Sequence, residues 1–463
     1  MKRFALGLTL GMALLAGCGD PVDPPPPPPP EEKPTGGNVD VSANITQDTT
    51  WTANNVYTLK NYVFVESGTL TIEPGTKILG GETSALIITR NAKLNAVGTA
   101  EKPIVFTSAQ AEGSRAAGDW GGVVLLGKAR INVSGGQNTV EGFFSTSGDE
   151  RTRYGGEDDT HDCGKLKYAR IEFAGFELAE DNELNGLTVG ACGTKTEIDY
   201  VQVHKGADDG VEMFGGTANL KHILISQPDD DGLDYDLGYT GKVQFLIVQQ
   251  NSTVGNRAIE ASGNKSSNTA TPRSVPEIWN ASFLGSNRPA ATTGVKQEGL
   301  VFNTGAGIKL NNAIVAYFAD RAVDVDGAAS AQLSETGGLS FKNIIFWDNK
   351  DDTKSIGYSA NPVKDASGTT TNEDATRLSD GSIYKEPERI LADGNHNLVV
   401  DPKLDAAMNV KTPNFKPAAE SPALIATSAA TPPADGFFDT SATFIGAVGG
   451  QDWTAGWTAY PEK

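Results

Sequence analysis

The chain repeats one apolar pattern in Ile198-Asp-Tyr-Val-Gln-Val203, Leu220-Lys-His-Ile-Leu-Ile225 and Val243-Gln-Phe-Leu-Ile-Val248. The pattern is Φ-x-x-Φ-x-Φ, in which Φ is an apolar residue and x is any residue. It recurs at intervals of 22 to 35 residues, with further copies that begin at Leu166, Ile278, Leu310 and Phe341. Short strands at this spacing predict coils that stack on one another at about 4.8 Å.

A second set of short apolar strands lies between these repeats, over residues 187–189, 211–213, 233–235 and 259–261. Tight Asn-Gly hairpins, which a β-sandwich needs, are mostly missing, and a propeller would repeat every 40 to 50 residues or so. We therefore predict an all-β fold, a single right-handed parallel β-helix over residues 38–463. Its open ends need caps, which we predict over Asn38–Tyr57 and Phe437–Trp457.

The N-terminus has the three parts of an export signal. Lys2 and Arg3 precede an apolar run of about a dozen residues, which is too short to span a bilayer. Leu15-Ala16-Gly17-Cys18 then resembles the bacterial lipobox, in which the cysteine is acylated. We predict a lipoprotein signal peptide over residues 1–17 and lipid attachment at Cys18, although an ordinary cleaved signal is the alternative.

Residues 18–37 contain an unbroken proline run, Pro24–Pro30. Polyproline rises about 3.1 Å per residue, so this run predicts a semi-rigid stalk of roughly 20 Å. Gly19 follows the cysteine, where an aspartate would favour retention in the inner membrane. We expect a lipid anchor in the outer membrane, with the folded domain at the cell surface.

The mature chain is strongly acidic. Loss of residues 1–17 removes Lys2 and Arg3 and leaves 36 basic against 58 acidic residues. This balance argues against nucleic acid and anionic lipid surfaces as partners and favours cation binding. Besides Cys18, the only cysteines are Cys163 and Cys192, which we predict to form a disulfide because exported domains fold in an oxidising compartment. Two free buried thiols are the alternative.

Several phrases resemble a known family. They include Leu70-Thr-Ile-Glu-Pro-Gly-Thr76, Gly118-Asp-Trp-Gly-Gly122 and Asp208-Asp-Gly-Val-Glu-Met-Phe-Gly-Gly-Thr217. In these the chain is similar to secreted or lipid-anchored β-helix proteins of Bacteroidetes and myxobacteria, over roughly residues 40 to 325. The resemblance implies the fold and a cell-surface location. It implies no activity and no catalytic residues, because that family is mostly uncharacterised.

Acidic residues recur at equivalent positions of successive coils. The alignment places Asn185, Asp209 and Asp231 before the second strand, and Arg257 at the next coil. Like charges 4.8 Å apart repel by roughly 1 kcal/mol in water and several times more in a protein, and Ca²⁺ relieves such repulsion. The predicted metal ligands are Asp209, Glu212, Asp231, Asp234 and Glu260. The alternative is that Asp209-Gly210 and Asp231-Gly232 are simply turns.

These features favour a structural, adhesive or glycan-binding rod on the cell surface over an enzyme. Its expected partners are the membrane, through the lipid anchor, and an extracellular polysaccharide or surface protein. Trp120, Trp279 and Trp347 are candidate faces for sugar stacking. The alternative function is a Ca²⁺-dependent polysaccharide lyase or hydrolase of the pectin-lyase type, with Arg257 or Lys205 as the proton acceptor.

Overall fold

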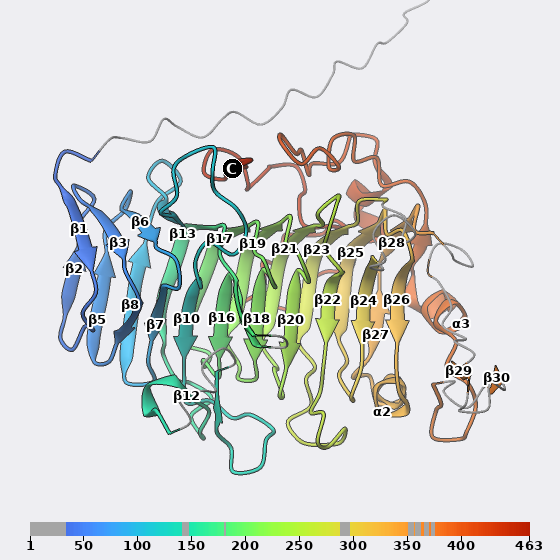
Figure 1. Cartoon of the computed structure of the whole chain (residues 1–463). Coiled ribbons are helices and arrows are strands. Elements are labelled where there is room, and N and C mark those ends of the chain that lie inside the picture. Colours follow the sequence, from blue (N-terminus) through green and yellow to red (C-terminus); the bar gives the residue numbers. More distant parts are fainter. Residues whose placement is uncertain are drawn as a thin grey trace, which may run out of the picture.

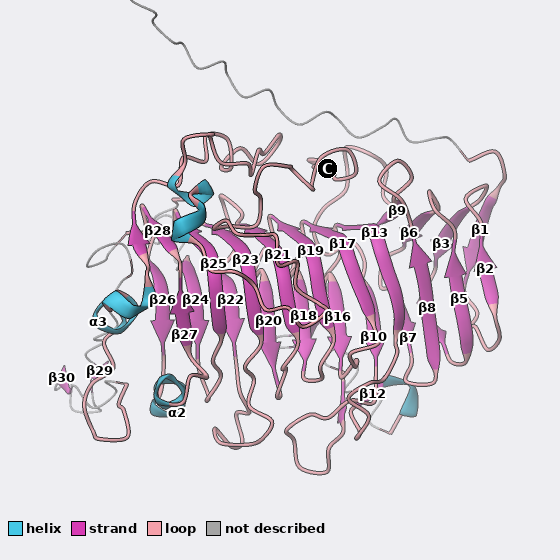
Figure 2. Ribbon diagram, turned by 180° about the vertical axis from the view of Figure 1, so that it is seen from behind, coloured by secondary structure: helices cyan, strands magenta, loops and turns pink. Residues whose placement is uncertain are grey.

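The structure is a computed structural model that describes residues 34–140, 148–179, 182–287, 297–350, 356, 363–364, 370–371 and 376–463. Within these residues the chain coils into a right-handed parallel β-helix (Figures 1 and 2), as the repeat predicts. The predicted signal peptide, Cys18 and the proline run lie outside the described residues. Among the described residues, no helix is long and apolar enough to cross a membrane.

Two long parallel sheets form the walls of the β-helix, and we call them sheet A and sheet B. Sheet B has nine strands, which are β4 (Tyr62–Val65), β7 (Ala85–Ile88), β10 (Val123–Leu126), β16 (Leu187–Gly190), β18 (Val211–Phe214), β20 (Leu233–Asp236), β22 (Arg257–Ala261), β24 (Glu298–Phe302) and β26 (Arg321–Val325).

Sheet A has sixteen strands, several of which are long enough to turn a corner. They are β1 (Asn38–Val41), β2 (Thr49–Trp51), β3 (Val56–Leu59), β5 (Gly68–Ile72), β6 (Lys77–Gly80), β8 (Ala92–Val97), β9 (Ile104–Ser108), β13 (Gly164–Glu172), β17 (Glu197–His204), β19 (Asn219–Ser226), β21 (Lys242–Gln249), β23 (Glu277–Leu284), β25 (Lys309–Ala316), β27 (Ser340–Lys342), β28 (Ile345–Trp347) and β31 (Leu398–Val399).

The remaining elements are small. Three two-stranded ribbons pair β11 (Asn138–Thr139) with β12 (Arg153–Tyr154), β14 (Phe176–Ala179) with β15 (Asn182–Leu184), and β29 (Val363–Lys364) with β30 (Thr370–Thr371). The described α-helices are α2 (Ala328–Ala331) and α3 (Glu386–Ile390). Short 3₁₀ turns cover Glu150–Thr152, Gln332–Glu335, Asp393–Asn395, Pro422–Leu424 and Ala426–Ser428.

A left-handed residue explains the three-residue step in the repeat. Ile198 and Val201 are both buried, although residues three apart in a flat strand point to opposite faces. Tyr200, between them, has a φ of 54°, which turns the chain so that both apolar side chains face the core. The equivalent residues of the next two coils, His222 and Phe245, have φ values of 49° and 62°. The pattern therefore encodes a corner as well as a strand.

The C-terminal segment takes a course that the repeat does not predict. Residues 401–463, which we call the C-terminal strap, run back along the outer face of sheet A (Figure 1). The predicted cap, Phe437–Trp457, lies within this strap and packs on the side of the coils, with Trp457 against Tyr168 and Phe438 against Trp279. The reason is that sheet A has an apolar outer stripe that needs cover, made by Leu224, Ile247, Leu284, Ile314 and Ile345.

Other residues close the two ends of the β-helix. At the C-terminal end, Leu378, Tyr384 and Ile390 join the central core. At the N-terminal end, the predicted cap forms the first coil, in which Trp51 stacks on Tyr57 at 4.9 Å between ring centroids. The C-terminal end is therefore covered by a short local segment, the N-terminal end is formed by the first coil itself, and the strap covers the side.

Candidate functional site

Acidic side chains stack on the outer face of sheet B. Backbone pairing aligns Glu212 of β18 with Asp234 of β20, and Asp234 with Glu260 of β22. Their strand neighbours, such as Val211 and Leu233, are fully buried in the core. Because side chains alternate along a strand, the acidic residues point to the opposite face. The register is the one that the alignment of coils predicts.

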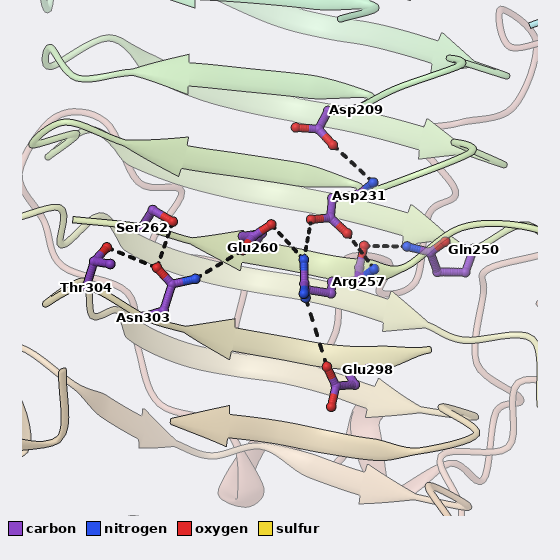
Figure 3. Close-up of polar contacts among 9 residues, drawn as sticks. All are labelled: Asp209, Asp231, Gln250, Arg257, Glu260, Ser262, Glu298, Asn303 and Thr304. Atoms are coloured by element: carbon purple, nitrogen blue, oxygen red, sulfur yellow. Dashed lines mark hydrogen bonds and ion pairs between the residues drawn. The ribbon is translucent and has the colours of Figure 1, made fainter. Parts of the chain in front are cut away.

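A second column occupies the corner just before these strands (Figure 3). Asn185 Oδ1 accepts the backbone N–H of Asp209 at 3.3 Å, and Asp209 Oδ1 accepts that of Asp231 at 3.0 Å. Asp231 Oδ1 then accepts the N–H of Arg257 at 2.6 Å. Each side chain thus ties its own corner to the next coil. Asn185 performs this task without a charge, so the turn alone does not require aspartate at the other two coils.

Three of the five predicted ligands come together. Asp209, Glu212 and Asp234 each offer a carboxylate oxygen, and these oxygens lie within 4.8 Å of one another. A second group of three shares Asp209 and adds Asp208 and Asp230. Oxygens bound to one Ca²⁺ at 2.3–2.6 Å lie no more than about 5 Å apart, so the geometry of both groups fits a calcium ion. We call these residues the carboxylate cluster.

Burial makes the carboxylate cluster electrostatically costly. Asp209 is 6% exposed and Glu212 is 8% exposed. Burial, followed by the neighbouring carboxylates, raises the pKa of Asp209 well above its ordinary value. Burial likewise raises the pKa of Asp234 well above its ordinary value, and that of nearby Asp229 to about 6. Without a cation, this cluster therefore takes up protons more readily than exposed aspartates do.

The other two predicted ligands belong to an arginine network. Arg257 Nη1 lies 2.6 Å from Glu260 and 3.4 Å from Asp231, and its Nε lies 4.0 Å from Glu298 (Figure 3). Asn303 Nδ2 also donates to Glu260 at 3.0 Å. Protein groups therefore bind both carboxylate oxygens of Glu260. In Asp231, Oδ1 accepts the backbone N–H at the corner and Oδ2 faces the guanidinium of Arg257. The predicted ligand set thus separates into a carboxylate cluster and an ion-paired end.

This ion-paired end extends farther than the sequence pattern indicated. Glu298 of β24 aligns with Arg257 and with Arg321 of β26. Arg321 binds Glu298 at 3.2 Å and Asp324 at 3.2 Å. The long insertion between β22 and β24 obscured this alignment. The alternating Glu298-Gly-Leu300 and Arg321-Ala-Val323 could have revealed it.

The predicted proton acceptors are poorly placed for that role. Nearby Asp231, Glu260 and Glu298 outweigh the effect of burial and raise the pKa of Arg257, so its guanidinium stays protonated. Lys205 Nζ donates to the carbonyl oxygen of Glu462 in the C-terminal strap, at 2.6 Å. Asp231 is 1% exposed. Arg257 is therefore held by carboxylates and Lys205 by the C-terminal strap, and neither is placed as a free base.

The predicted tryptophan platforms are buried or partly buried. Trp120 is fully buried and donates to the carbonyl oxygen of Glu172 at 2.9 Å. Trp279 is 7% exposed beneath Phe438. Trp347 is partly buried against the apolar cluster beneath the C-terminal strap. The expectation of sugar stacking is therefore wrong for Trp120, which the core buries, and for Trp279, which the strap covers, whereas Trp347 keeps part of its surface exposed.

The two cysteines of the folded domain are bonded to each other. Cys163 and Cys192 form a disulfide across 29 residues of sequence. It joins the residue before β13 to the segment after β16, so it connects the two sheets. This pairing is the one predicted from the cysteine count.

Comparison with protein families gives one match. The family described as "Pectate-lyase like beta helix domain" matches residues 43–386, which is more than half of the chain. No curated protein and no solved structure matches the chain significantly.

Proposed function

We propose that this chain, which belongs to the pectate-lyase-like β-helix family, is a calcium-stabilised rod of the cell surface that binds its ligand without cleaving it. The observation that carries the proposal is the grouping of carboxylate oxygens of Asp209, Glu212 and Asp234 within 4.8 Å of one another. Buried like charges at this spacing are relieved either by protons or by a counter-ion. A calcium ion bound by carboxylate oxygens supplies one.

Charge distribution along sheet B supports this assignment. At the ion-paired end, Arg257 and Arg321 alternate with Glu298 and Asp324. At the carboxylate cluster, the neutral side-chain amide of Asn185 donates a hydrogen bond to Glu212. Arginine side chains thus neutralise the acidic residues of the ion-paired end. In our proposal a bound cation neutralises those of the carboxylate cluster.

Binding without cleavage is supported by the state of Arg257. A lyase needs a base that accepts a proton from the sugar ring, and a guanidinium held by three carboxylates keeps its own. The burial of Asp209 and Asp231 also leaves no room for a sugar chain to reach them. A metal ion can be held there for stability, while the ligand binds elsewhere on the rod.

Cell-surface attachment is supported by the N-terminal sequence. The apolar run, the lipobox-like Leu15-Ala16-Gly17-Cys18 and the proline run are the parts of an exported, lipid-anchored protein. The resemblance to lipid-anchored β-helix proteins of Bacteroidetes and myxobacteria agrees with this. We propose an outer-membrane lipoprotein whose partner is an extracellular polysaccharide or surface protein.

The alternative is a Ca²⁺-dependent polysaccharide lyase. The family description and the presence of one arginine among carboxylates favour it. This alternative requires Arg257 to lose a proton in the complex, although its carboxylate partners stabilise the protonated guanidinium. A cleavage assay therefore separates the two functions directly.

The test uses residues 34–463, which contain every described strand. Calcium binding is measured by calorimetry, and unfolding is measured with and without Ca²⁺. We expect about 2.7 kcal/mol of added stability at a hundredfold excess of Ca²⁺ over Kd. Asp234→Asn should abolish most of this gain. The matched control is Asp324→Asn, in the same outward column but paired with Arg321. It should keep the full calcium response.

The same preparations are incubated with acidic and neutral polysaccharides, and both binding and the unsaturated product of lyase cleavage are followed. Binding without product supports the proposed rod. Calcium-dependent product that disappears in Arg257→Ala would instead establish the lyase. Equal calcium responses in Asp234→Asn and the wild type would refute the carboxylate cluster as the cation site.

A further inference from the structure

Residues 376–391, which we call the end segment, close the C-terminal end of the β-helix core. The end segment contains α3, which packs against β26 (Figure 1). Its side chains of Leu378, Tyr384 and Ile390 are buried and belong to the central core. Among the described residues, β26 is the last strand of sheet B. The end segment therefore separates the last coil of sheet B from solvent.

Two side chains attach the end segment to the main chain at the end of β26. Thr376 Oγ1 donates to the carbonyl oxygen of Val325 at 2.8 Å and accepts the N–H of Gly327 at 3.2 Å. Glu386 Oε1 accepts the N–H of Val325 at 3.3 Å. Both main-chain groups of Val325 are thus bound by the end segment. In this way the end segment takes the place of a further strand at the edge of sheet B.

Glu386 occupies a position in which its negative charge is costly. The residue is 0% exposed, and its Oε2 accepts no hydrogen bond within the described part of the chain. Asp324 of β26, whose charge acts on Glu386, also has a buried oxygen, Oδ1, without a hydrogen bond there. An ionised oxygen that is buried without a donor is unfavourable. A proton on Glu386 removes this cost, because the acid form is neutral.

The charged groups of the neighbouring strands leave Glu386 only partly compensated. Arg321 of β26 is the nearby cation, and it lies 3.2 Å from Asp324 and 3.2 Å from Glu298 of β24. Its charge is thus shared with two other carboxylates. Burial, followed by Asp324, outweighs the effect of Arg321 and raises the pKa of Glu386 to about 7.

The charged groups of the end segment itself have less influence on Glu386. Lys385 and Glu388 pair with each other at 2.9 Å, and both side chains are exposed. Such a pair is screened by solvent. The charges of Glu386 and Arg389 both act on Tyr384, which stays neutral because burial raises its pKa. Burial and Asp324 therefore dominate the protonation of Glu386.

We propose that the end segment is a pH-dependent closure of the rod, which is fixed to β26 while Glu386 carries a proton and loosens when Glu386 ionises. The folded-state pKa lies above that of an unfolded glutamate, so the folded form binds this proton more tightly. The stabilisation is complete below about pH 4.5, decreases as pH rises and is lost above about pH 7. Neither calcium nor a glycan takes part, so this inference stands or fails separately from the proposed function.

The test is hydrogen exchange of residues 34–463 in metal-free buffer at about pH 5.5 and about pH 8, corrected for the intrinsic rates. We expect the amides of α3 to open about tenfold or more at the higher pH, whereas those of β21, in the middle of the rod, should not follow. Glu386→Gln is neutral at both pH values and should remove the difference. The matched control is Glu388→Gln, which changes an exposed glutamate of the same helix and should behave as the wild type does.

A wild type without the pH difference, a difference that persists in Glu386→Gln, or an equal loss of it in Glu388→Gln would each overturn the proposal. Asp324→Asn is a second test, which also decides the case if Glu386→Gln does not fold. It removes the neighbouring carboxylate, so Glu386 should ionise more readily and the midpoint of loosening should move to lower pH. A midpoint that stays at the wild-type value would overturn the role of Asp324 and, with it, the proposed closure.

Discussion

At the scale of single residues, Asp209 combines two tasks that can be separated. Its Oδ1 accepts the N–H of Asp231 and so fixes the corner of the coil. Its charge adds to a buried cluster that raises its pKa. Asn185 shows that the first task needs only a side-chain oxygen. The turn therefore does not require the charge, and in our proposal the charge serves to bind a cation.

Asp209→Asn should therefore stabilise the metal-free protein and weaken its response to calcium. The raised folded-state pKa means that the folded protein binds this proton more tightly, so its stability falls as pH rises above about 4. The variant lacks this loss and should be more stable than the wild type by roughly 1–2 kcal/mol near pH 8. Urea unfolding of both proteins at about pH 4 and about pH 8, without metal, measures this difference in stability. With saturating Ca²⁺ the order should reverse.

The opposite order of stabilities would contradict this prediction. If Asp209→Asn is less stable than the wild type at pH 8 without metal, then the carboxylate is satisfied by the protein itself. The interpretation of this position as a simple turn would then be correct.

At the scale of elements, the corner in sheet A connects the fold to the strap. Tyr200, His222 and Phe245 adopt positive φ there, and Asn280 and Asn312 occupy the same position in later coils, with φ of 52° for both. In the later coils the corner side chain is an amide that reaches the strap, since Asn312 bonds Ala430. In the earlier coils the corner side chains are rings that stack on one another, as Tyr200 does on His222 at 4.1 Å.

Asn312 offers a test of this double role. Asn312→Ala should cost roughly 2–4 kcal/mol, because alanine tolerates a positive φ poorly and leaves two polar groups of Ala430 without their partner. Asn312→Gly keeps the corner and loses only the contacts, so it should cost less. Urea unfolding of the two variants measures the difference. Equal losses would show that the corner conformation contributes nothing.

At the scale of the whole molecule, the C-terminal strap joins coils that are far apart in sequence. Arg170 contacts Trp457 across 287 residues, and His204 contacts Pro461 across 257. The ring of His204 is fully buried, with one nitrogen 2.9 Å from Ser226 Oγ and the other 2.9 Å from the Pro461 carbonyl oxygen. The end of the strap therefore lies over a titratable group.

Acid should loosen the end of the strap. Burial lowers the pKa of His204 to about 3 from an ordinary value of 6.5. A histidine that is kept neutral by folding contributes stability above pH 6.5 that is lost as pH falls toward 3, by at most about 1.4 kcal/mol per pH unit. Hydrogen exchange over residues 457–463 should be faster at about pH 5 than at pH 7.5 after correction for the intrinsic rate. His204→Gln should remove this difference, and its persistence would exclude His204 as the cause.

The apolar repeat by itself determined the coils. Each coil is built from contacts between its own apolar residues and the equivalent residues of the neighbouring coils. It also determined that Glu212, Asp234 and Glu260 align along sheet B, because parallel stacking places equivalent residues above one another. Only the tertiary structure decided the path of the strap, the burial of Trp279 beneath it and the partial burial of Trp347. It also decided that Glu260 turns to Arg257 and away from the carboxylate cluster. These outcomes depend on side-chain contacts between distant segments, which a short-range periodicity does not encode.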